Sequence, residues 1–525
     1  MLSAQQAWPM AAQTCAAVAV PLNLSAAAST RTVSPYGGHK VSHMSESLNA
    51  LDATAQAALI ASGDVSPREM VDAAIEQAER VNGDINAIIH PRFDRARDEV
   101  AGGLPQGPFT GVPMVLKDLG ASMAGEPHHM GTRFLKNANY VAKTDSYLTR
   151  RFRNAGFVVI GRTNTPEFGN TITTEPLSYG PSRNPWNLEH STGGSSGGSA
   201  ASVASHIVSV GHANDGGGSI RIPAAECGLV GLKPSRGRVS KGPDLGESWM
   251  GSTIDGCVTR TVRDTAAVLD VICGYEPGDP YTAPPFARPL LQEVGVNPGR
   301  LRIGILDHPL FAHQTDHAES RESIRRTAEL LTSLGHDVSV AWPTALEDPD
   351  SAGKFTAIVA AWTHADVSTF EKILGRDIGE GDMEPDNLLM RELGRNVSTG
   401  MYLDNMMWLH AWCREVVQWW EPMDGSQGFD ILVTPTIAGP PPKIGYLAGT
   451  DGTRHLLEVL AYTAQFNLTG QPAISLPLHW SNTGLPMGVQ FVAAPFREDV
   501  LVRLAAQLEQ AAPWHDRVAP LVSNS

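Results

Sequence analysis

Residues 191–221 of this 525-residue chain read STGGSSGGSAASVASHIVSVGHANDGGGSIR and contain two glycine–serine clusters, 193–198 and 215–219. A small-residue segment and a short β-branched run separate the clusters, which predicts a loop, a short helix, a strand and a second loop. A helix of about ten residues covers roughly 15 Å, and a strand of about five residues covers roughly 17 Å in the return direction. Both clusters are therefore expected at the same edge of a sheet, with Ser195 and Ser219 close together.

Three glycines, residues 216–218, stand immediately before Ser219. Glycine permits positive φ angles and close approach of the backbone to a ligand, so consecutive N–H groups at this position can receive an oxyanion. Loss of one such donor costs ~3 kcal/mol of transition-state stabilisation in known enzymes. A phosphate-binding P-loop instead requires Gly-Lys followed by Ser or Thr, and neither cluster has that sequence.

The chain carries 40 Lys and Arg against 55 Asp and Glu, a formal net charge of -15, and 42% of its residues are apolar. This composition is typical of a globular protein with a large core. No Lys- or Arg-rich run occurs, which argues against nucleic acid and anionic membrane as partners. No apolar run reaches the ~18 residues that indicate a transmembrane helix.

Five cysteines lie far apart in the sequence and none belongs to a C-x-x-C pair. We therefore expect reduced thiols in a cytoplasmic protein, without a zinc site. The five are Cys15, Cys227, Cys257, Cys273 and Cys413. The His128-His129 pair lacks the spacing of metal ligands, so we interpret it as part of a solvated or hydrogen-bonded loop.

The N-terminal 43 residues have two interpretations. Residues 11–21 are rich in Ala and Val and are followed by Ala-Ala-Ala at 26–28, as in a secretory signal peptide. No Lys or Arg precedes Arg31, however, so the basic segment that begins such a peptide is missing. We expect residues 1–43 to be a disordered extension ahead of a domain spanning 44–520.

Alternating helix and strand signals predict an α/β domain whose sheet is covered by helices on both faces. Ser66-Pro67-Arg68-Glu69 forms a capping box with proline at the first helical position, and Gly83 ends the predicted helix. Residues 310–425 are predominantly helical, and because strands return after them we interpret them as an elaboration on one domain. Strands are predicted at 85–89, 111–118, 157–160 (ended by Gly161), 207–210, 301–306, 431–433, 473–476 and 488–492, and further helices at 199–206, 261–271 and 498–510.

Lys117 follows the apolar strand predicted at 111–118. A lysine in this position either extends its charged end to the surface or is functional, and the local sequence favours the surface interpretation.

The serine clusters match two other hydrolase motifs only superficially. Residues 193–197 fit G-x-S-x-G, but the nucleophile elbow of α/β-hydrolases follows a strand directly, whereas residues 183–190 have the composition of a loop. The S-x-x-K pattern of β-lactamases also fails, because Gly198 and Ile222 stand three residues after Ser195 and Ser219.

Several long motifs in order make a more specific match. Segments 193–199 (GGSSGGS), 215–221 (DGGGSIR) and 228–234 (GLVGLKP) resemble the signature of the amidase signature family, and 111–118 is similar to the segment that supplies the family's lysine. The chain is identified as a member of this family over about residues 45–515 by that resemblance. The resemblance implies an α/β fold with a single large mixed β-sheet between helical layers, and a helical elaboration near the active site.

The resemblance also implies roles for individual residues. Ser219 corresponds to the acyl-forming nucleophile, Ser195 to a bridging serine in a cis peptide, and Lys117 to the base, which replaces the surface interpretation of that lysine. A lysine can act as a base only when neutral, which burial favours. The backbone N–H groups of Gly216, Gly217, Gly218 and Ser219 correspond to the oxyanion hole. No metal or organic cofactor is implied.

The implied activity is hydrolysis of carboxylic amides through an acyl-enzyme. The neighbourhood of Ser219 and the segment 184–187 resemble the branch that hydrolyses cyclic or linear oligoamides such as 6-aminohexanoate cyclic dimer, while aryl amides and carbamates stay open. Gly216 replaces the Thr or Ile of many members, and we expect it to enlarge the space beside Ser219. An alternative is the glutamine-hydrolysing A subunit of a tRNA-dependent amidotransferase. The expected partner is a small amide substrate, and a homodimer is a candidate assembly.

Five of the eleven tryptophans fall within residues 362–420, where an apolar series recurs at near-helical spacing. The series is Met401, Trp408, Trp412, Val416 and Trp419. It predicts either the buried face of one helix or the apolar lining of an acyl pocket, and both hold if the helix packs across the mouth of the site.

Overall fold

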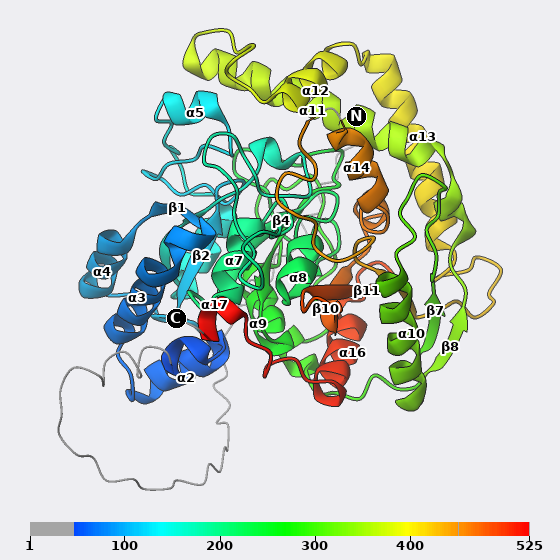
Figure 1. Cartoon of the computed structure of the whole chain (residues 1–525), viewed down its shortest axis with the longest axis horizontal. Coiled ribbons are helices and arrows are strands. Elements are labelled where there is room, and N and C mark those ends of the chain that lie inside the picture. Colours follow the sequence, from blue (N-terminus) through cyan, green and yellow to red (C-terminus); the bar gives the residue numbers. More distant parts are fainter. Residues whose placement is uncertain (1–46, 450, 524–525) are drawn as a thin grey trace, which may run out of the picture. The chain divides into compact units, whose positions relative to one another are not determined.

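A mixed β-sheet runs through the computed structural model, which describes residues 47–449 and 451–523. Within these residues the sheet has eleven strands in the order β1-β3-β2-β4-β6-β5-β10-β11-β9-β7-β8 (Figure 1). The strands are β1 (Ile88–Pro91), β2 (Pro113–Lys117), β3 (Val158–Thr163), β4 (Val210–Asp215), β5 (Val230–Lys233), β6 (Ile254–Thr259), β7 (Arg302–Ile305), β8 (Asp337–Val340), β9 (Ile431–Pro435), β10 (Ala473–Trp480) and β11 (Pro486–Ala493). Strands β3, β2 and β4 are parallel, as are β9, β7 and β8, and the remaining neighbours are antiparallel. The predicted mixed α/β sheet is confirmed.

Helices cover both faces of the sheet, as expected. Successive side chains of a strand point to opposite faces, and in β3 Val158 and Ile160 join one apolar cluster while Val159 joins another. The first face carries α3 (Pro67–Ile85), α4 (Phe93–Gly102), α7 (Gly197–Ala204) and α8 (Arg221–Cys227). The second carries α6 (Tyr147–Asn154), α9 (Val262–Ile272), α10 (Ala318–Ser333) and α16 (Glu498–Ala511). Further helices are α2 (Ala53–Ser62), α5 (Arg133–Asn137), α14 (Gly452–Val459), α15 (Gln465–Leu468) and α17 (Pro520–Ser523).

The first predicted helix is longer than expected. The capping box of Ser66 and Glu69 is present, but α3 continues past Gly83 to Ile85. It ends because Asn86 adopts a left-handed conformation and the Asn82 side chain accepts hydrogen bonds from the next two backbone N–H groups. The strand predicted at 85–89 therefore begins only at residue 88.

Two other predicted strands have different limits. Gly161 does not end β3, since glycine there allows close approach to β1: a Cβ on Gly161 would lie 2.7 Å from Ile88 Cγ2. The strand predicted at 207–210 instead begins at Val210 and runs to Asp215. His206 has a φ of 59° and turns the chain after α7, which delays the strand.

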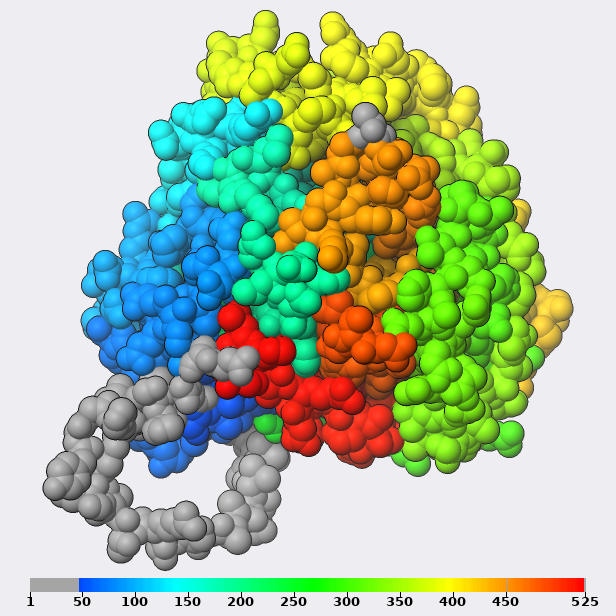
Figure 2. Space-filling view, in the orientation of Figure 1, coloured from blue at the N-terminus to red at the C-terminus, as the bar shows by residue number. Residues whose placement is uncertain are grey.

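The predicted helical elaboration also contains a strand. Besides α10 it comprises α11 (Asp350–Leu374), α12 (Pro385–Arg395) and α13 (Thr399–Val417), and β8 adds an edge strand parallel to β7. Figure 2 shows α11 and α12, in yellow-green and yellow, at the top of the view.

The predicted tryptophan-rich helix is α13, and its buried face is narrower than expected. Leu409, Trp412 and Val416 are buried, whereas Met401 is 53% exposed. Trp412 also donates a hydrogen bond through Nε1 to the backbone oxygen of Ala345 at 2.7 Å. In the part of the chain that the structure describes, no helix combines the length and apolarity needed to cross a membrane.

Candidate active site

The two glycine–serine clusters meet where two parallel strands end. Strand β2 ends at Lys117 and its neighbour β4 ends at Asp215, and the carboxyl ends of parallel strands lie at the same edge of a sheet. The first cluster reaches this edge because Ser196 Oγ donates a hydrogen bond to the backbone oxygen of Asn214 at 3.3 Å. Helix α7 and strand β4 thus bring the chain back to its starting edge, as the segment lengths predict.

Lys117 is fully buried at this edge. Its Nζ donates hydrogen bonds of 2.6 Å to Ser195 Oγ and 2.6 Å to Asn214 Oδ1. Burial lowers the pKa of the ammonium group to about 7, although the charges of Asp255 and Asp215 act in the opposite direction. The surface position that the local sequence favours is therefore wrong, and the buried position implied by the family resemblance is correct.

Ser195 stands in a tightly packed backbone segment. The Gly194–Ser195 peptide is cis, and Gly193 has a φ of 70°. A Cβ on Gly193 would lie 2.7 Å from Pro223 Cα, so a larger residue would push the first cluster away from α8. Gly169 lies on the other side, where an added Cβ would be 3.0 Å from Ser195 Oγ.

The loop that carries Ser219 is wound around the carboxylate of Asp215. This carboxylate accepts hydrogen bonds from the N–H groups of Gly218 at 2.7 Å and Ile220 at 3.1 Å, and from two nitrogens of Arg221 at 2.9 Å each. Burial alone would raise the pKa of Asp215, but the Arg221 charge and these hydrogen bonds hold it below its usual value. The carboxylate therefore stays charged and fixes the loop.

This network corrects one expected oxyanion donor. The N–H group of Gly218 is already bound to Asp215, so in this structure it does not point to a free anion site. Among the described residues, the N–H groups of Gly216, Gly217 and Ser219 have no hydrogen-bond acceptor. Ser219 Oγ likewise has no partner there, and no hydrogen bond joins it to Ser195.

Gly216 does not open space beside Ser219, contrary to expectation. The indole of Trp249 occupies that space, and a Cβ on Gly216 would lie 2.7 Å from Trp249 Cζ3. The space that the missing side chain of Gly216 leaves is thus filled by the large side chain of Trp249.

Several residues of the site were missed by reasoning from the sequence. Asn214 and Asp215 directly precede the glycines, and their place at the end of a strand is the signal that could have identified them. Thr463 and Asn467 come from a distant segment: Thr463 Oγ1 donates to Gly217 O at 2.6 Å, and Asn467 Nδ2 donates to the Asp215 carboxylate at 2.8 Å. No local pattern marks these two residues.

The His128-His129 pair lies in a hydrogen-bonded loop behind Lys117, which confirms the simpler interpretation. Arg162 contacts His128 Nδ1 at 2.7 Å and Asp118 at 3.1 Å. The His129 N–H also donates to the Asp118 carboxylate. Burial lowers the pKa of His128 to about 3 and that of His129 to about 4.

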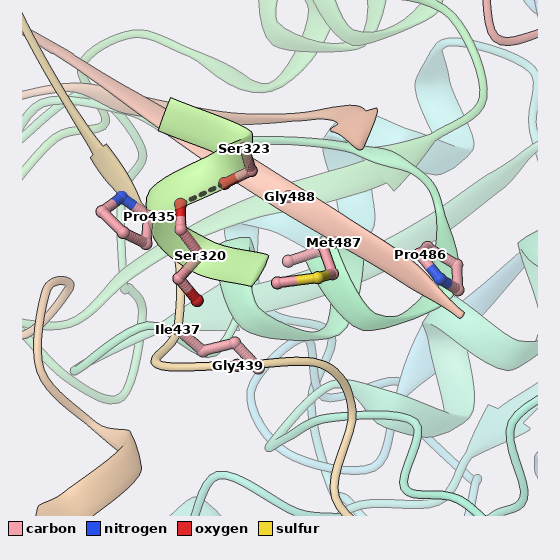
Figure 3. Close-up of a pocket in the computed structure, with 9 residues that line it drawn as sticks. Ser320, Ser323, Pro435, Ile437, Gly439, Pro486, Met487 and Gly488 are labelled. Atoms are coloured by element: carbon pink, nitrogen blue, oxygen red, sulfur yellow. Dashed lines mark hydrogen bonds between the residues drawn. The ribbon is translucent and has the colours of Figure 1, made fainter. Parts of the chain in front are cut away.

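A separate recess lies between α10 and β11 and contains none of these residues (Figure 3). Figure 3 shows Ser323 donating a hydrogen bond to the backbone of Ser320 at its wall. The recess has no room for a water molecule, so it is not a substrate site. Its lining residues are Ala225, Ser320, Ser323, Pro435, Ile437, Gly439, Pro486, Met487 and Gly488.

Known proteins resemble this chain in both sequence and fold. A sequence model of the family described as Amidase matches residues 69–502. A 6-aminohexanoate-cyclic-dimer hydrolase from Paenarthrobacter ureafaciens is 42% identical over 486 residues, covering 90% of this chain and 97% of that protein. The solved structure of 6-aminohexanoate cyclic dimer hydrolase complexed with substrate has a TM-score of 0.86 and 41% identity, covering 90% of this chain and 99% of that one. A bacterial aryl acylamidase of the amidase signature family has a TM-score of 0.79 and 27% identity, covering 90% and 98%.

These matches define the chain as an amidohydrolase. It belongs to the amidase signature family, as the glycine–serine motifs indicate.

Proposed function

We propose that the protein hydrolyses carboxylic amides with Ser219 as nucleophile, Ser195 as proton relay and Lys117 as base. The observation that carries this proposal is the 2.6 Å hydrogen bond between Lys117 Nζ and Ser195 Oγ, at the sheet edge where the Ser219 loop begins. A serine hydroxyl is a weak nucleophile until a positioned base accepts its proton. Lys117 and Ser195 together supply that base.

The protonation state of Lys117 supports its role. With a pKa of about 7, Lys117 is neutral in about half of the protein molecules at pH 7. An exposed lysine with a pKa near 10.4 is almost always charged at this pH. Neutral Lys117 accepts the Ser195 proton while Ser195 accepts the proton of Ser219. The proton then returns along the same path to the leaving amine, and water completes the cycle by hydrolysing the acyl-serine ester.

Backbone N–H groups of the loop stabilise the oxyanion in this proposal. The N–H groups of Gly216, Gly217 and Ser219 are the donors, since that of Gly218 is bound to Asp215. Thr463 supports the arrangement, because its Oγ1 donates a hydrogen bond to the Gly217 carbonyl oxygen at 2.6 Å and fixes this part of the loop. Donors fixed in this way do not have to reorganise when negative charge develops on the substrate.

The proposed substrates are bulky, aryl or oligomeric amides, including cyclic ones, with carbamates as a further class. The names of the 6-aminohexanoate cyclic dimer hydrolase and the aryl acylamidase support this range. We further propose that the elaboration 310–425 of the domain 44–520 contributes to the substrate pocket. Phe355 on α11 supports this, because a Cβ on Gly217 would lie 3.5 Å from its ring.

Three properties of the whole protein are part of the proposal. The net charge of -15 supports the absence of a nucleic-acid partner. Free Cys227, Cys257, Cys273 and Cys413 support a cytoplasmic location. A homodimer is a candidate assembly that light scattering on the purified protein can test.

A panel of amides with ammonia and amine release measured separately tests the proposed function. The wild type should release acid and amine in equal amounts, and added hydroxylamine should divert the acyl group into a hydroxamate. Ser219→Ala should abolish both products while leaving the thermal unfolding transition in place. Turnover by Ser219→Ala near the wild-type rate would contradict the proposed nucleophile.

A further inference from the structure

The ring of Trp249 packs directly against the backbone of Gly216. A Cβ on Gly216 would lie 2.7 Å from Cζ3 and 2.8 Å from Cε3 of the indole, distances that real Cβ atoms do not reach. An indole is rigid and has no flexible end that could move aside. Gly216 and Trp249 are therefore matched in size, although 33 positions separate them.

The backbone of residues 249–251, which carries the indole, is fixed by its neighbours. Trp249, Met250 and Gly251 have consecutive positive φ angles of 49°, 58° and 71°. Residues other than glycine adopt this backbone conformation at an energetic cost. Arg236 Nε donates a hydrogen bond to the Gly251 oxygen at 2.7 Å, and the Tyr281 hydroxyl leaves no room for a side chain at Gly251. The surrounding structure thus fixes the backbone next to Trp249, whose ring packs against Gly216.

A second ring stands beside the next glycine. The Phe355 ring would lie 3.5 Å from a Cβ on Gly217 and meets the Trp249 ring edge to face, with centroids 6.0 Å apart and planes at 72°. Both side chains are half-buried, so each keeps part of its surface accessible. One ring comes from the loop before β6 and the other from α11. Together they form an apolar wall along two consecutive residues of the Ser219 loop.

We propose that Trp249 and Phe355 are specificity-determining residues that admit amides with an unbranched carbon next to the carbonyl group and exclude amides branched at that carbon. This inference rests on the proposed function, because it places the substrate carbonyl oxygen at the N–H groups of Gly216 and Gly217. The groups attached to the carbonyl carbon then lie along the two rings. A methylene chain packs against an aromatic face, whereas a branch requires the volume that the rings occupy.

Trp249→Ala tests the proposal with paired substrates, N-butylhexanamide and its analogue methylated on the carbon next to the carbonyl. The wild type should prefer the unbranched amide by at least about 50-fold in kcat/KM. Trp249→Ala should reduce this preference at least about tenfold, mainly by raising kcat/KM for the branched amide. An unchanged preference, or an equal loss on both substrates, would overturn the proposal. Trp480→Ala is the matched control: this half-buried tryptophan at the end of β10 meets Trp186 edge to face, outside the elaboration 310–425, and the preference should not change.

A double-variant cycle tests the size match independently. Gly216→Ala alone should lower kcat/KM for the unbranched amide about 100-fold, since its methyl group meets the indole. In the Trp249→Ala background the same change should cost less than about tenfold. Equal losses in both backgrounds would show that the rings do not control this position. The substrate preference is a ratio of kcat/KM values measured on active enzyme, so it can be measured even if Ser219→Ala shows that another residue is the nucleophile. The proposed nucleophile and the proposed role of the two rings can therefore fail separately.

Discussion

Lys117 and Ser195 are 78 positions apart in the sequence, yet Lys117 Nζ donates a 2.6 Å hydrogen bond to Ser195 Oγ. The contact exists because β2 ends where the cluster before α7 begins. It places a fully buried ammonium group against a hydroxyl, and among the described residues Asn214 is its one other side-chain acceptor. The removal of Lys117 from water is what brings its pKa to about 7.

The pH dependence of activity follows from this burial. Below pH 7 the protonated Lys117 cannot accept a proton, so kcat/KM should rise about tenfold per pH unit and level off above a midpoint near 7. Lys117→Ala should lose several orders of magnitude. Lys117→Arg should be as inactive, because a guanidinium group does not deprotonate in proteins. An Arg variant with a tenth of the activity would show that only the positive charge of Lys117 matters.

Asn214 should set the position of that midpoint. Its Oδ1 accepts from Lys117 Nζ at 2.6 Å, and its Nδ2 donates to Leu119 O at 2.9 Å. Asn214→Asp places a carboxylate beside Lys117, which favours the charged lysine and should move the midpoint up by at least about one pH unit. Asn214→Ala removes an acceptor without adding charge and should move it down. Identical pH–rate profiles for both variants would rule out this control of Lys117.

Covalent labelling should identify the nucleophile. Ser219 Oγ is free of hydrogen bonds to the described residues, so a fluorophosphonate or sulfonyl fluoride probe should react with it. Peptide mapping by mass spectrometry locates the adduct, and Ser219→Ala should abolish labelling. Ser195→Ala serves as the comparison and should slow labelling without changing its site. An adduct on Ser195 in the wild type would reverse the two proposed roles.

The sequence predicts that the two glycine–serine clusters meet at one sheet edge, because this depends only on neighbouring segments of the chain. Glycine clusters, a short helix and a short strand determine where residues 193–198 and 215–219 return. The position of Lys117 required the family resemblance, since an apolar strand followed by lysine is more typical of a surface residue. The limits of α3 and β4 depend on a hydrogen bond to the Asn82 side chain and on the left-handed conformation of His206. Neither can be read from the hydrophobic periodicity of the sequence.

The parts that could not be predicted are long-range. Asp215 fixes the loop together with Asn467, and Trp249 fills the space beside Gly216. Nothing in the residues around Gly216 indicates that a tryptophan from another loop stands there. Gly216 alone therefore predicts open space, whereas Gly216 and Trp249 together are closely packed.

Glu167 should limit stability at alkaline pH. Burial, with a smaller contribution from Glu384, raises its pKa from 4.5 to about 8. Its carboxyl accepts from the Glu384 N–H at the start of α12, while Oε1 is buried without a partner in the described residues. Between about pH 4.5 and 8 the folded chain holds a proton that the unfolded chain releases, so stability falls as pH rises through this window.

Glu167→Gln removes that titration and keeps an acceptor for the Glu384 N–H. Urea unfolding should therefore show no difference from the wild type at pH 4, and a gain for the variant of up to about 4 kcal/mol at pH 8. Glu415→Gln is the control, because Glu415 is exposed on α13 and has no ion-pair partner among the described residues, and this variant should unfold like the wild type at both pH values. A variant that is equally destabilised at both pH values would show that Glu167 acts through packing alone.

The last prediction concerns substrate size and decides between the two candidate activities. The Ser219 loop faces the half-buried rings of Trp249 and Phe355, and a small amide leaves this apolar wall in contact with water. Burying a few methylene groups against it at about 0.8 kcal/mol each accounts for about 2.7 kcal/mol, or a factor of about 100. We therefore expect kcat/KM for a long-chain or aryl amide to exceed that for acetamide or glutamine by at least ~100-fold, with ammonia and amine release measured separately. Phe355→Ala should narrow this gap by lowering kcat/KM for the long amides only. Glutamine hydrolysed as fast as the bulky amides would contradict the prediction and favour the glutamine-hydrolysing A subunit of an amidotransferase, because such a subunit needs a pocket that fits one small polar amide.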